Sequence, residues 1–374
     1  MADAMETQSK SFFLAKSQFQ TLIGLLKSEG YRTIGPTIDQ EAIVYDEIDS
    51  IDQFPIGWTD EQGPGHYRLK EREDREWFGF AVGPHSWKRY LFPPTSTLLS
   101  AEKTDQGWSF IPRASDHTQY ALLGVRACEL AALRIQDRVF LEGPYQDPIY
   151  RERRERLLIV AVNCSQPADT CFCTSMNTGP SCQSGFDIRM TELSDGFVCD
   201  AATPKGEQIL GNCSLRAASD DELQAAVQVQ QGTVDQITRR MDTSDLPGLL
   251  RSNLNHPHWK EVGERCLSCT NCTMVCPTCF CSSVTEIRDL NVDRVERQRS
   301  WDSCFNPDFS YLGGSLVRND TASRYRQWLT HKLDTWHSQF GTSGCVGCGR
   351  CITWCPVGID ITEEVAAFRQ EAVS

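Results

Sequence analysis

The chain has 374 residues, 18 cysteines and a formal net charge of −13 at pH 7. Its length is enough for about two or three domains that each bury a core, so the cysteines are not needed as the disulfides of a small secreted domain. The negative charge disfavours nucleic acid and anionic membranes as partners. The first residues, MADAMETQSKSFFLAK, contain no basic and apolar leader, and no segment approaches the roughly 20 apolar residues of a membrane span. We therefore expect a soluble, cytoplasmic protein that binds neither nucleic acid nor membrane.

Residues 1–115 are predicted to form an N-terminal mixed α/β region. A helix is expected over residues 17–29, where a glycine ends it, and short strands are expected over 33–38 (TIGPTI) and 41–45 (EAIVY). Residues 52–69 are rich in glycine, proline and aromatic side chains, and this composition favours an ordered surface loop over a strand.

Residues 116–218 change to an alternation of strands and helices. A helix is expected over 129–140, and the strands are expected over 120–125, 157–162, 186–193 and 196–203. A crossover of this kind places its strands side by side and parallel. The basic run RERRER, residues 151–156, is interpreted as a solvated turn before a strand and not as a binding patch.

Four cysteines of this second region stand at strand ends or in the loop that follows. Cys128 follows the first strand and opens the helix, Cys164 follows the second strand, and Cys171 and Cys173 lie in the next loop. Because ligands gather at the carboxyl ends of parallel strands, these thiols are placed to converge on an iron-sulfur cluster. Ordinary buried or loop thiols are the alternative, since cysteine is a small apolar residue. The remaining cysteines of the region have no such placement: Cys182, Cys199 and Cys213.

Residues 219–260 are predicted to be a helical connector, because the polar, glutamine-rich segment 221–241 has helical character. The cluster domain, residues 261–374, follows. It is expected to end in a short helix over 363–373, with Asp360 and Glu363 spaced as a capping box.

Two boxes of identical cysteine spacing dominate the last domain. Residues 266–277 read CLSCTNCTMVCP and residues 345–356 read CVGCGRCITWCP, so each is Cys-x-x-Cys-x-x-Cys-x-x-x-Cys-Pro. This is the spacing of a bacterial two-cluster ferredoxin, in which the fourth cysteine of each box ligates the other cluster. The predicted ligands are Cys266, Cys269, Cys272 and Cys355 for the first [4Fe-4S] cluster, and Cys345, Cys348, Cys351 and Cys276 for the second. The cysteines described above then raise the hypothesis of a third.

Zinc is the alternative metal for paired Cys-x-x-Cys units, but it favours two well separated pairs, whereas each box packs four cysteines into one short run. The predicted fold is thus an N-terminal α/β region with parallel strands, followed by an α-helical, ferredoxin-type domain with two [4Fe-4S] clusters.

Three more cysteines lie inside the cluster domain but outside the boxes. Cys279 and Cys281 follow the first box directly, and Cys304 precedes a Gly-Gly turn. With the nearby Asp302 they are candidates for a further metal site, or for shielding and tuning the first cluster, and both interpretations stay open.

No catalytic residue and no dinucleotide or nucleotide site is predicted. The chain has neither a strand-borne G-x-G-x-x-G nor a G-x-x-x-x-G-K-[ST] phosphate loop. Clusters without a substrate site indicate a relay between proteins that do have such sites.

The whole chain resembles the beta subunit of soluble sulfhydrogenases, which are NAD(P)-linked nickel-iron hydrogenases, and less closely the A subunit of anaerobic sulfite reductase. The segments that carry the resemblance include GPTIDQEAIVYDEI, GVRACELAAL, CPTCFC, WDSCFNPDF and the two boxes. The resemblance to this family includes the pattern of Cys128, Cys164, Cys171 and Cys173. One residue departs from the family pattern: Glu129 stands where Asp is expected.

The resemblance implies an electron-transfer subunit within a heterotetramer. Its partners would be a flavin subunit that binds NAD(P)H and a large and small nickel-iron hydrogenase pair. Two other functions stay open: the equivalent role in a sulfite-reductase-type complex, and an independent thiol or disulfide reductase that uses Cys-Phe-Cys cysteines beside a cluster.

Overall fold

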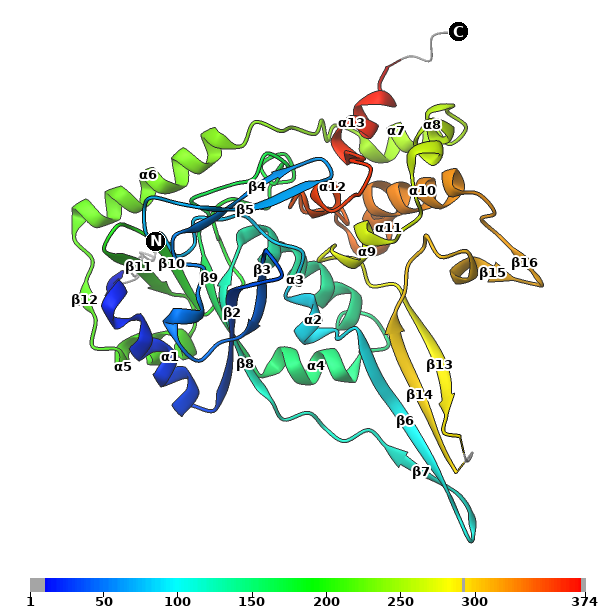
Figure 1. The fold of residues 1–374 in the computed structure, drawn as a ribbon, viewed down its shortest axis with the longest axis horizontal. Coiled ribbons are helices and arrows are strands. Elements are labelled where there is room, and N and C mark those ends of the chain that lie inside the picture. The colour runs from blue at the N-terminus through cyan, green and yellow to red at the C-terminus, as the bar shows by residue number, and fades with distance from the viewer. Residues whose placement is uncertain (1–10, 291–292, 371–374) are drawn as a thin grey trace, which may run out of the picture.

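The computed structural model describes residues 11–290 and 293–370. Its largest element is an eight-stranded sheet with the strand order β12-β1-β11-β10-β9-β8-β2-β3 (Figure 1). The strands are β1 (Phe12–Ala15), β2 (Tyr31–Asp39), β3 (Ala42–Glu47), β8 (Gln119–Val125), β9 (Leu157–Val162), β10 (Ile188–Glu192), β11 (Gly196–Ala201) and β12 (Arg216–Ala217). Strands from residues 1–115 and from 116–218 thus share one sheet.

The centre of this sheet is parallel: β2, β8, β9 and β10 run in the same direction, while β3, β11, β1 and β12 pair antiparallel. Every residue of β9 is buried, as expected for a strand covered on both faces. The predicted mixed α/β sheet with parallel strands is confirmed, because the apolar runs of β8 and β9 are joined by helical crossovers.

Different helices cover the two faces of the sheet. α1 (Phe19–Ser28) and α5 (Pro204–Asn212) pack on the face that carries Leu123 and Val160. The opposite face, which carries Leu122 and Ile159, packs against α2 (Lys88–Leu91), α3 (Ala127–Phe140) and α4 (Pro148–Glu155). Neighbouring residues of one strand therefore enter different cores, which is the period of two expected for a strand.

The prediction of a loop is wrong for residues 52–69. They are not a loop without strands, because β4 (Trp58–Gly63) and β5 (His66–Glu71) pair as an antiparallel hairpin. The glycines and prolines that suggested a loop lie mostly outside the strands: Pro55 and Gly57 precede β4, and Pro64 and Gly65 form the turn, where Gly65 has a φ of +67°.

The prediction of a turn is wrong for the basic run 151–156. It is not a turn: α4 continues through Glu155, and the Asp147 side chain caps its start by accepting a hydrogen bond from the Tyr150 N–H. Arg153 pairs with Asp116, and Arg154 pairs with Asp137. These internal ion pairs account for two of the four arginines, and Arg156 donates to the Asp116 carbonyl oxygen.

A second, four-stranded antiparallel sheet projects from the body as an arm (Figure 1). It consists of β6 (Thr95–Thr104), β7 (Gly107–Pro112), β13 (Ser282–Arg288) and β14 (Arg294–Trp301). Because β14 pairs with β6, the cluster domain completes a sheet that begins far earlier in the chain. The description of residues 261–374 as α-helical is therefore not confirmed: besides β13 and β14 they contain β15 (Tyr311–Leu312) and β16 (Ser315–Leu316).

The remaining helices form the connector and surround the cysteine boxes. They are α6 (Asp220–Gln236), α7 (Leu246–Ser252), α8 (His258–Arg265), α9 (Asn271–Met274), α10 (Thr321–Thr330), α11 (Trp336–Phe340), α12 (Arg350–Thr353) and α13 (Ile361–Ala367). The end of the predicted last helix, 371–373, lies outside the described residues. Asp360 caps α13 by accepting from the Thr362 N–H.

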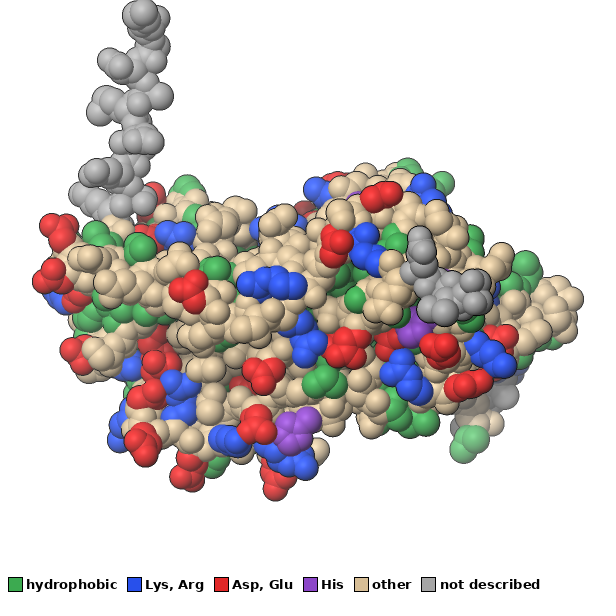
Figure 2. Space-filling view, turned by 90° about the horizontal axis from the view of Figure 1, so that it is seen from above, with side chains coloured by type: hydrophobic (Ala, Val, Ile, Leu, Met, Phe, Trp, Pro, Cys, Tyr) green, Lys and Arg blue, Asp and Glu red, His purple; other side chains and the backbone are tan. Residues whose placement is uncertain are grey.

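Acidic and basic side chains are interspersed on the face drawn in Figure 2, without a field of one sign. Across residues 11–290 and 293–370, no helix combines the length and the apolar character needed to cross a bilayer.

Candidate functional site

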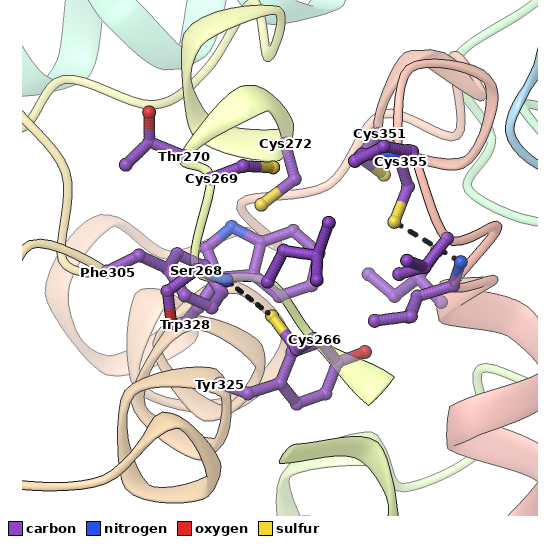
Figure 3. Close-up of a pocket in the computed structure, with 15 residues that line it drawn as sticks. Cys266, Ser268, Cys269, Thr270, Cys272, Phe305, Tyr325, Trp328, Cys351 and Cys355 are labelled. Carbon is purple, nitrogen blue, oxygen red and sulfur yellow. Dashed lines mark hydrogen bonds between the residues drawn. The ribbon is translucent and has the colours of Figure 1, made fainter. Parts of the chain in front are cut away.

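The first cavity collects cysteines from both boxes. Cys266, Cys269 and Cys272 surround it on one side, and Cys355 of the second box reaches it from the other (Figure 3). Its walls are apolar and aromatic: Phe305, Tyr325, Trp328, Ile359 and Ile361. All four thiols predicted for the first cluster therefore line this cavity, and Cys351, which was predicted for the second cluster, lines it as well.

The other four box cysteines, Cys276, Cys345, Cys348 and Cys351, are the set predicted for the second cluster. Burial raises the pKa of Cys345 to about 12, and the nearby Cys348 and Cys276 thiolates also raise it. The pKa of Cys351 is raised well above its usual value by burial and then by Cys345, Cys348 and Cys276. Cys276 of the first box lies close to the start of the second, because the Lys332 Nζ donates at 3.3 Å to the Cys276 Sγ and at 3.1 Å to the carbonyl oxygen of Gly344, the residue directly before Cys345. A bound metal would replace the thiol protons, since ligands must be deprotonated.

The two boxes share an unusual backbone conformation. Ser268 and Thr270 in the first box have φ values of +50° and +68°, and Gly347 and Gly349 at the matching positions of the second have +63° and +76°. Left-handed backbone at non-glycine residues is strained and is concentrated at functional sites. In this conformation the Ser268 N–H lies 3.5 Å from the Cys266 Sγ, and the Gly347 N–H lies 3.4 Å from the Cys345 Sγ. Both loops thus turn amide donors toward ligand sulfur, as iron-sulfur sites require.

These cavities fit cubanes better than single ions. Among the described residues, no three His, Cys, Asp or Glu side chains lie close enough together to hold one metal ion. The thiolates of a cubane lie outside its iron and sulfide core, so they are more widely spaced than the four ligands of a zinc ion. The first cavity, with its separated thiols and apolar walls, offers the donors that such a core needs.

A third cavity lies at the carboxyl edge of the parallel strands. Cys128, in the first turn of α3, and Cys164, after β9, meet Cys171 and Cys173 there. The cavity has a volume of about 20 Å³, compared with about 30 Å³ at the first box. Burial raises the pKa of Cys171 to about 12, and the Cys164 and Cys348 thiolates contribute to that rise. All four cysteines that the strand ends suggested therefore converge, in a space similar to that of the first cavity.

The second box closes this third cavity. Gly347 and Cys348 line it together with the four thiols. A Cβ at Gly347 would lie 2.7 Å from the Cys173 backbone, and one at Gly349 would lie 2.6 Å from the Thr170 carbonyl oxygen. The glycines of the second box are thus required by the close approach of the loop that carries Cys171 and Cys173.

A buried charged network, which the sequence patterns did not suggest, lies between the second and third sets of thiols. Glu129 and Arg350 are almost fully buried and form an ion pair of 2.5 Å. Glu129 also accepts hydrogen bonds from the Tyr45 hydroxyl at 3.0 Å and from the Trp87 indole N–H at 2.8 Å. Arg126 is 1% exposed. Burial raises the pKa of Cys164, and the positive charge of the Arg126 guanidinium offsets part of this rise. Glu129, Arg350 and Arg126 differ from ordinary surface charges only in being buried, and burial cannot be read from the residue types.

The three extra cysteines of the cluster domain do not all meet. Cys281 and Cys304 lie side by side at an open groove with Phe309, Leu312 and Phe340. Cys279 instead lies beside Cys276. Asp302 accepts hydrogen bonds from the side chains of Ser283 and Asn306. A further metal here stays a prediction.

Comparison with known proteins agrees with this geometry. The family model described as a 4Fe-4S dicluster domain matches residues 265–359, which contain both boxes. The chain is therefore similar, in that part, to proteins that bind two [4Fe-4S] clusters.

The chain is also similar to the beta subunit of sulfhydrogenase 2 from Pyrococcus furiosus. The two are 27% identical over 362 residues, which cover 96% of this chain and 98% of that protein. The resemblance to sulfhydrogenase beta subunits is confirmed, and both comparisons support an iron-sulfur, electron-transferring role. No solved structure matches the chain significantly.

Proposed function

We propose that this chain is an electron-transfer subunit that relays single electrons through [4Fe-4S] clusters. The first cluster would be held by Cys266, Cys269, Cys272 and Cys355, and the second by Cys345, Cys348, Cys351 and Cys276. The bound clusters would supply one-electron redox chemistry. The protein residues supply the thiolates, the amide donors and apolar walls that exclude water.

The observation that carries the proposal is the order of the three cysteine sets. Cys351, assigned to the second cluster, also lines the first cavity, and Cys348 also lines the third. The second set therefore lies between the other two. A continuous row of redox sites suits a relay, whereas the described residues contain no evident substrate-binding motif.

A third [4Fe-4S] cluster on Cys128, Cys164, Cys171 and Cys173 belongs to the proposal. Its support is the convergence of four thiols in one apolar cavity and the presence of Arg126 as a buried positive charge beside Cys164. A cluster bound by thiolates is negative, so a buried guanidinium next to it offsets part of the cost of desolvation.

We further propose that the partners are a flavin subunit that binds NAD(P)H and a large and small nickel-iron hydrogenase pair. The support is the similarity to a sulfhydrogenase beta subunit over nearly the whole of both chains. Hydride transfer moves electrons in pairs and a flavin can release them singly, so a chain of one-electron carriers is needed between the two active sites.

The test uses the complete complex with Cys351→Ala in this chain. Hydrogen-dependent reduction of NAD(P) should be abolished, because the middle of the relay is cut. Flavin reduction by NAD(P)H and hydrogen oxidation with an artificial dye should both survive, because each uses its own subunit. Cys213→Ala, which removes a buried thiol far from the cavities, is the matched control and should keep the coupled activity.

Two results would contradict the relay. One is coupled activity that survives the loss of both box clusters. The other is turnover of hydrogen or NAD(P)H by the isolated, cluster-loaded chain.

A further inference from the structure

A buried lysine contacts the second set of cluster ligands directly. Lys332 is 3% exposed, and its Nζ donates to the Cys276 Sγ at 3.3 Å and to the Cys279 Sγ at 3.6 Å. The same ammonium donates to the Thr278 hydroxyl at 3.2 Å and to the Gly344 carbonyl oxygen at 3.1 Å. The ammonium group is thus held inside the protein by two cysteine sulfurs, a hydroxyl and a carbonyl oxygen.

The backbone around Lys332 is also unusual. It lies in a π-helical segment, His331–Thr335, between α10 and α11. Such segments widen a helix, are rare and are frequent at functional sites. Here the wide turn carries the lysine into the interior beside Cys276.

Lys332 has no carboxylate partner. Among the described residues, its Nζ lies within 4.0 Å of no Asp or Glu oxygen, although it is buried. A buried ammonium is costly unless negative charge compensates it. Of the groups that it touches, only the two cysteine sulfurs can carry negative charge.

A second lysine lies behind the first. Lys88 is 3% exposed, and its Nζ donates to the Cys279 carbonyl oxygen at 3.0 Å and lies 3.9 Å from the centre of the Trp301 ring. Burial lowers its pKa to about 8. It contacts carbonyl oxygen and an aromatic face, not sulfur, so its influence on the ligands is less direct.

The first cavity has no such donor. Its cysteine sulfurs accept from backbone amides: the Ser268 N–H at the Cys266 Sγ, and the Ile359 N–H at 3.3 Å from the Cys355 Sγ. The buried guanidinium of Arg324 lies near this box, where it donates at 3.4 Å to the Ser268 hydroxyl, and it also donates to the carbonyl oxygens of Arg318 and Asn319, but it makes no hydrogen bond to a cysteine sulfur among the described residues. The two boxes have the same cysteine spacing but differ in the charge placed against their ligands.

We propose that Lys332 is the counter-charge of the second cluster and raises its reduction potential above that of the first. This inference rests on the proposed assignment of Cys276 to the second cluster. Lys332 acts through Cys276 as a positioning residue: a fixed positive charge in a low-dielectric interior favours the more negative, reduced form of whatever that thiolate ligates. Hydrogen bonds to sulfur and local charge are both determinants of cluster potential.

The consequence concerns where an electron resides in the relay. The second set of thiols lies next to the first, so a higher potential there makes the second cluster, rather than the first, the preferred site of a single electron.

The test is a potentiometric titration, followed by electron paramagnetic resonance, of the anaerobically loaded full-length chain. The second-cluster signal is identified by its loss in Cys351→Ala. Lys332→Met should lower the potential of that signal enough to change its oxidised-to-reduced ratio at least tenfold, which is 59 mV for one electron. The first-cluster signal should not move. Lys332→Arg, which keeps the charge, should restore most of the shift.

Two further variants keep the test decisive. Lys88→Met should move the same signal in the same direction by a smaller amount, even if Lys332→Met binds iron poorly. Lys205→Met is the matched control, because the Lys205 Nζ donates at 3.1 Å to the Leu157 carbonyl oxygen in the sheet, away from the thiols. A second-cluster potential that is unchanged in both Lys332→Met and Lys88→Met overturns the inference. Because potentials are measured on the isolated chain, a failure of the hydrogen-to-NAD(P) relay would leave this result intact.

Discussion

The Phe172 N–H donates a 2.9 Å hydrogen bond to the carbonyl oxygen of Gly347. Phe172 separates two cysteines of the third cavity, and Gly347 belongs to the second cysteine box, so this bond joins two regions that are far apart in the sequence. The Thr178 hydroxyl strengthens the same junction by donating at 2.6 Å to the Val346 carbonyl oxygen. The cavities are therefore held as one unit and not as independent domains.

This junction makes Gly347 sensitive to substitution. Gly347→Ala should destabilise the loaded protein by more than the roughly 1–2 kcal/mol that left-handed backbone costs a residue with a side chain, because the new Cβ also collides with the Cys173 backbone. Thermal unfolding and iron content under anaerobic conditions measure the effect.

The control is the matching position of the first box. Ser268→Gly should leave stability unchanged or raise it by up to about 1 kcal/mol, because glycine relieves the strain at a φ of +50°. Equal tolerance of both substitutions would contradict the packing of the loop against the second box.

Cys276 and Cys272 should behave differently although they belong to one box. Cys272→Ala should damage the first cluster, and Cys276→Ala should damage the second, because Cys276 lies among the thiols of the other box. Electron paramagnetic resonance of the two reduced variants distinguishes the signals. Loss of the first cluster in both variants, with the second intact, would refute the crossed assignment.

The iron content of the chain depends on whether the third cavity holds a cluster. The anaerobically loaded chain should contain about twelve irons, four for each cubane, and Cys171→Ala should reduce this to about eight. Cys213→Ala removes a buried thiol outside the cavities and should leave the iron content unchanged. An iron content of eight in both the unmodified chain and Cys171→Ala would argue against a cluster at this edge of the sheet.

The Glu129–Arg350 ion pair should be important for stability. Glu129→Gln leaves Arg350 as an uncompensated buried charge, and breaking a pair of this kind costs about 3–5 kcal/mol. A marked fall in the thermal midpoint of the anaerobic protein is expected. The exposed pair of Lys260 and Glu264, 3.9 Å apart, provides the comparison, and Lys260→Met should cause no measurable change. Similar effects of both substitutions would mean that the buried pair contributes no more than a surface one.

Several features followed from the sequence because they depend on short-range patterns. The central parallel strands were predictable from the apolar runs 120–125 and 157–162, since a strand buried on both faces needs no polar alternation. The cysteine boxes were recognisable because three ligands of a cubane come from one short turn of chain, so their spacing can be read from a few consecutive residues. The same holds for Cys128 and Cys164, which strand ends bring to one edge.

Other features depended on partners far away in the chain. The hairpin of β4 and β5 was hidden by its glycines and prolines, and β14 became recognisable only through its pairing with β6. The buried roles of Glu129, Arg350 and Lys332 carry no local signature, because the same residue types usually lie at the surface.

The sequence by itself therefore determined which cysteines are available as ligands and how far apart they lie along the chain. Only the tertiary structure decided which of them share a cavity, in what order the cavities lie and which charges face them. The physical reason is that ligand spacing is a property of a few consecutive residues. Burial and electrostatic contact are instead properties of distant segments packed together, and they act strongly only once water is excluded.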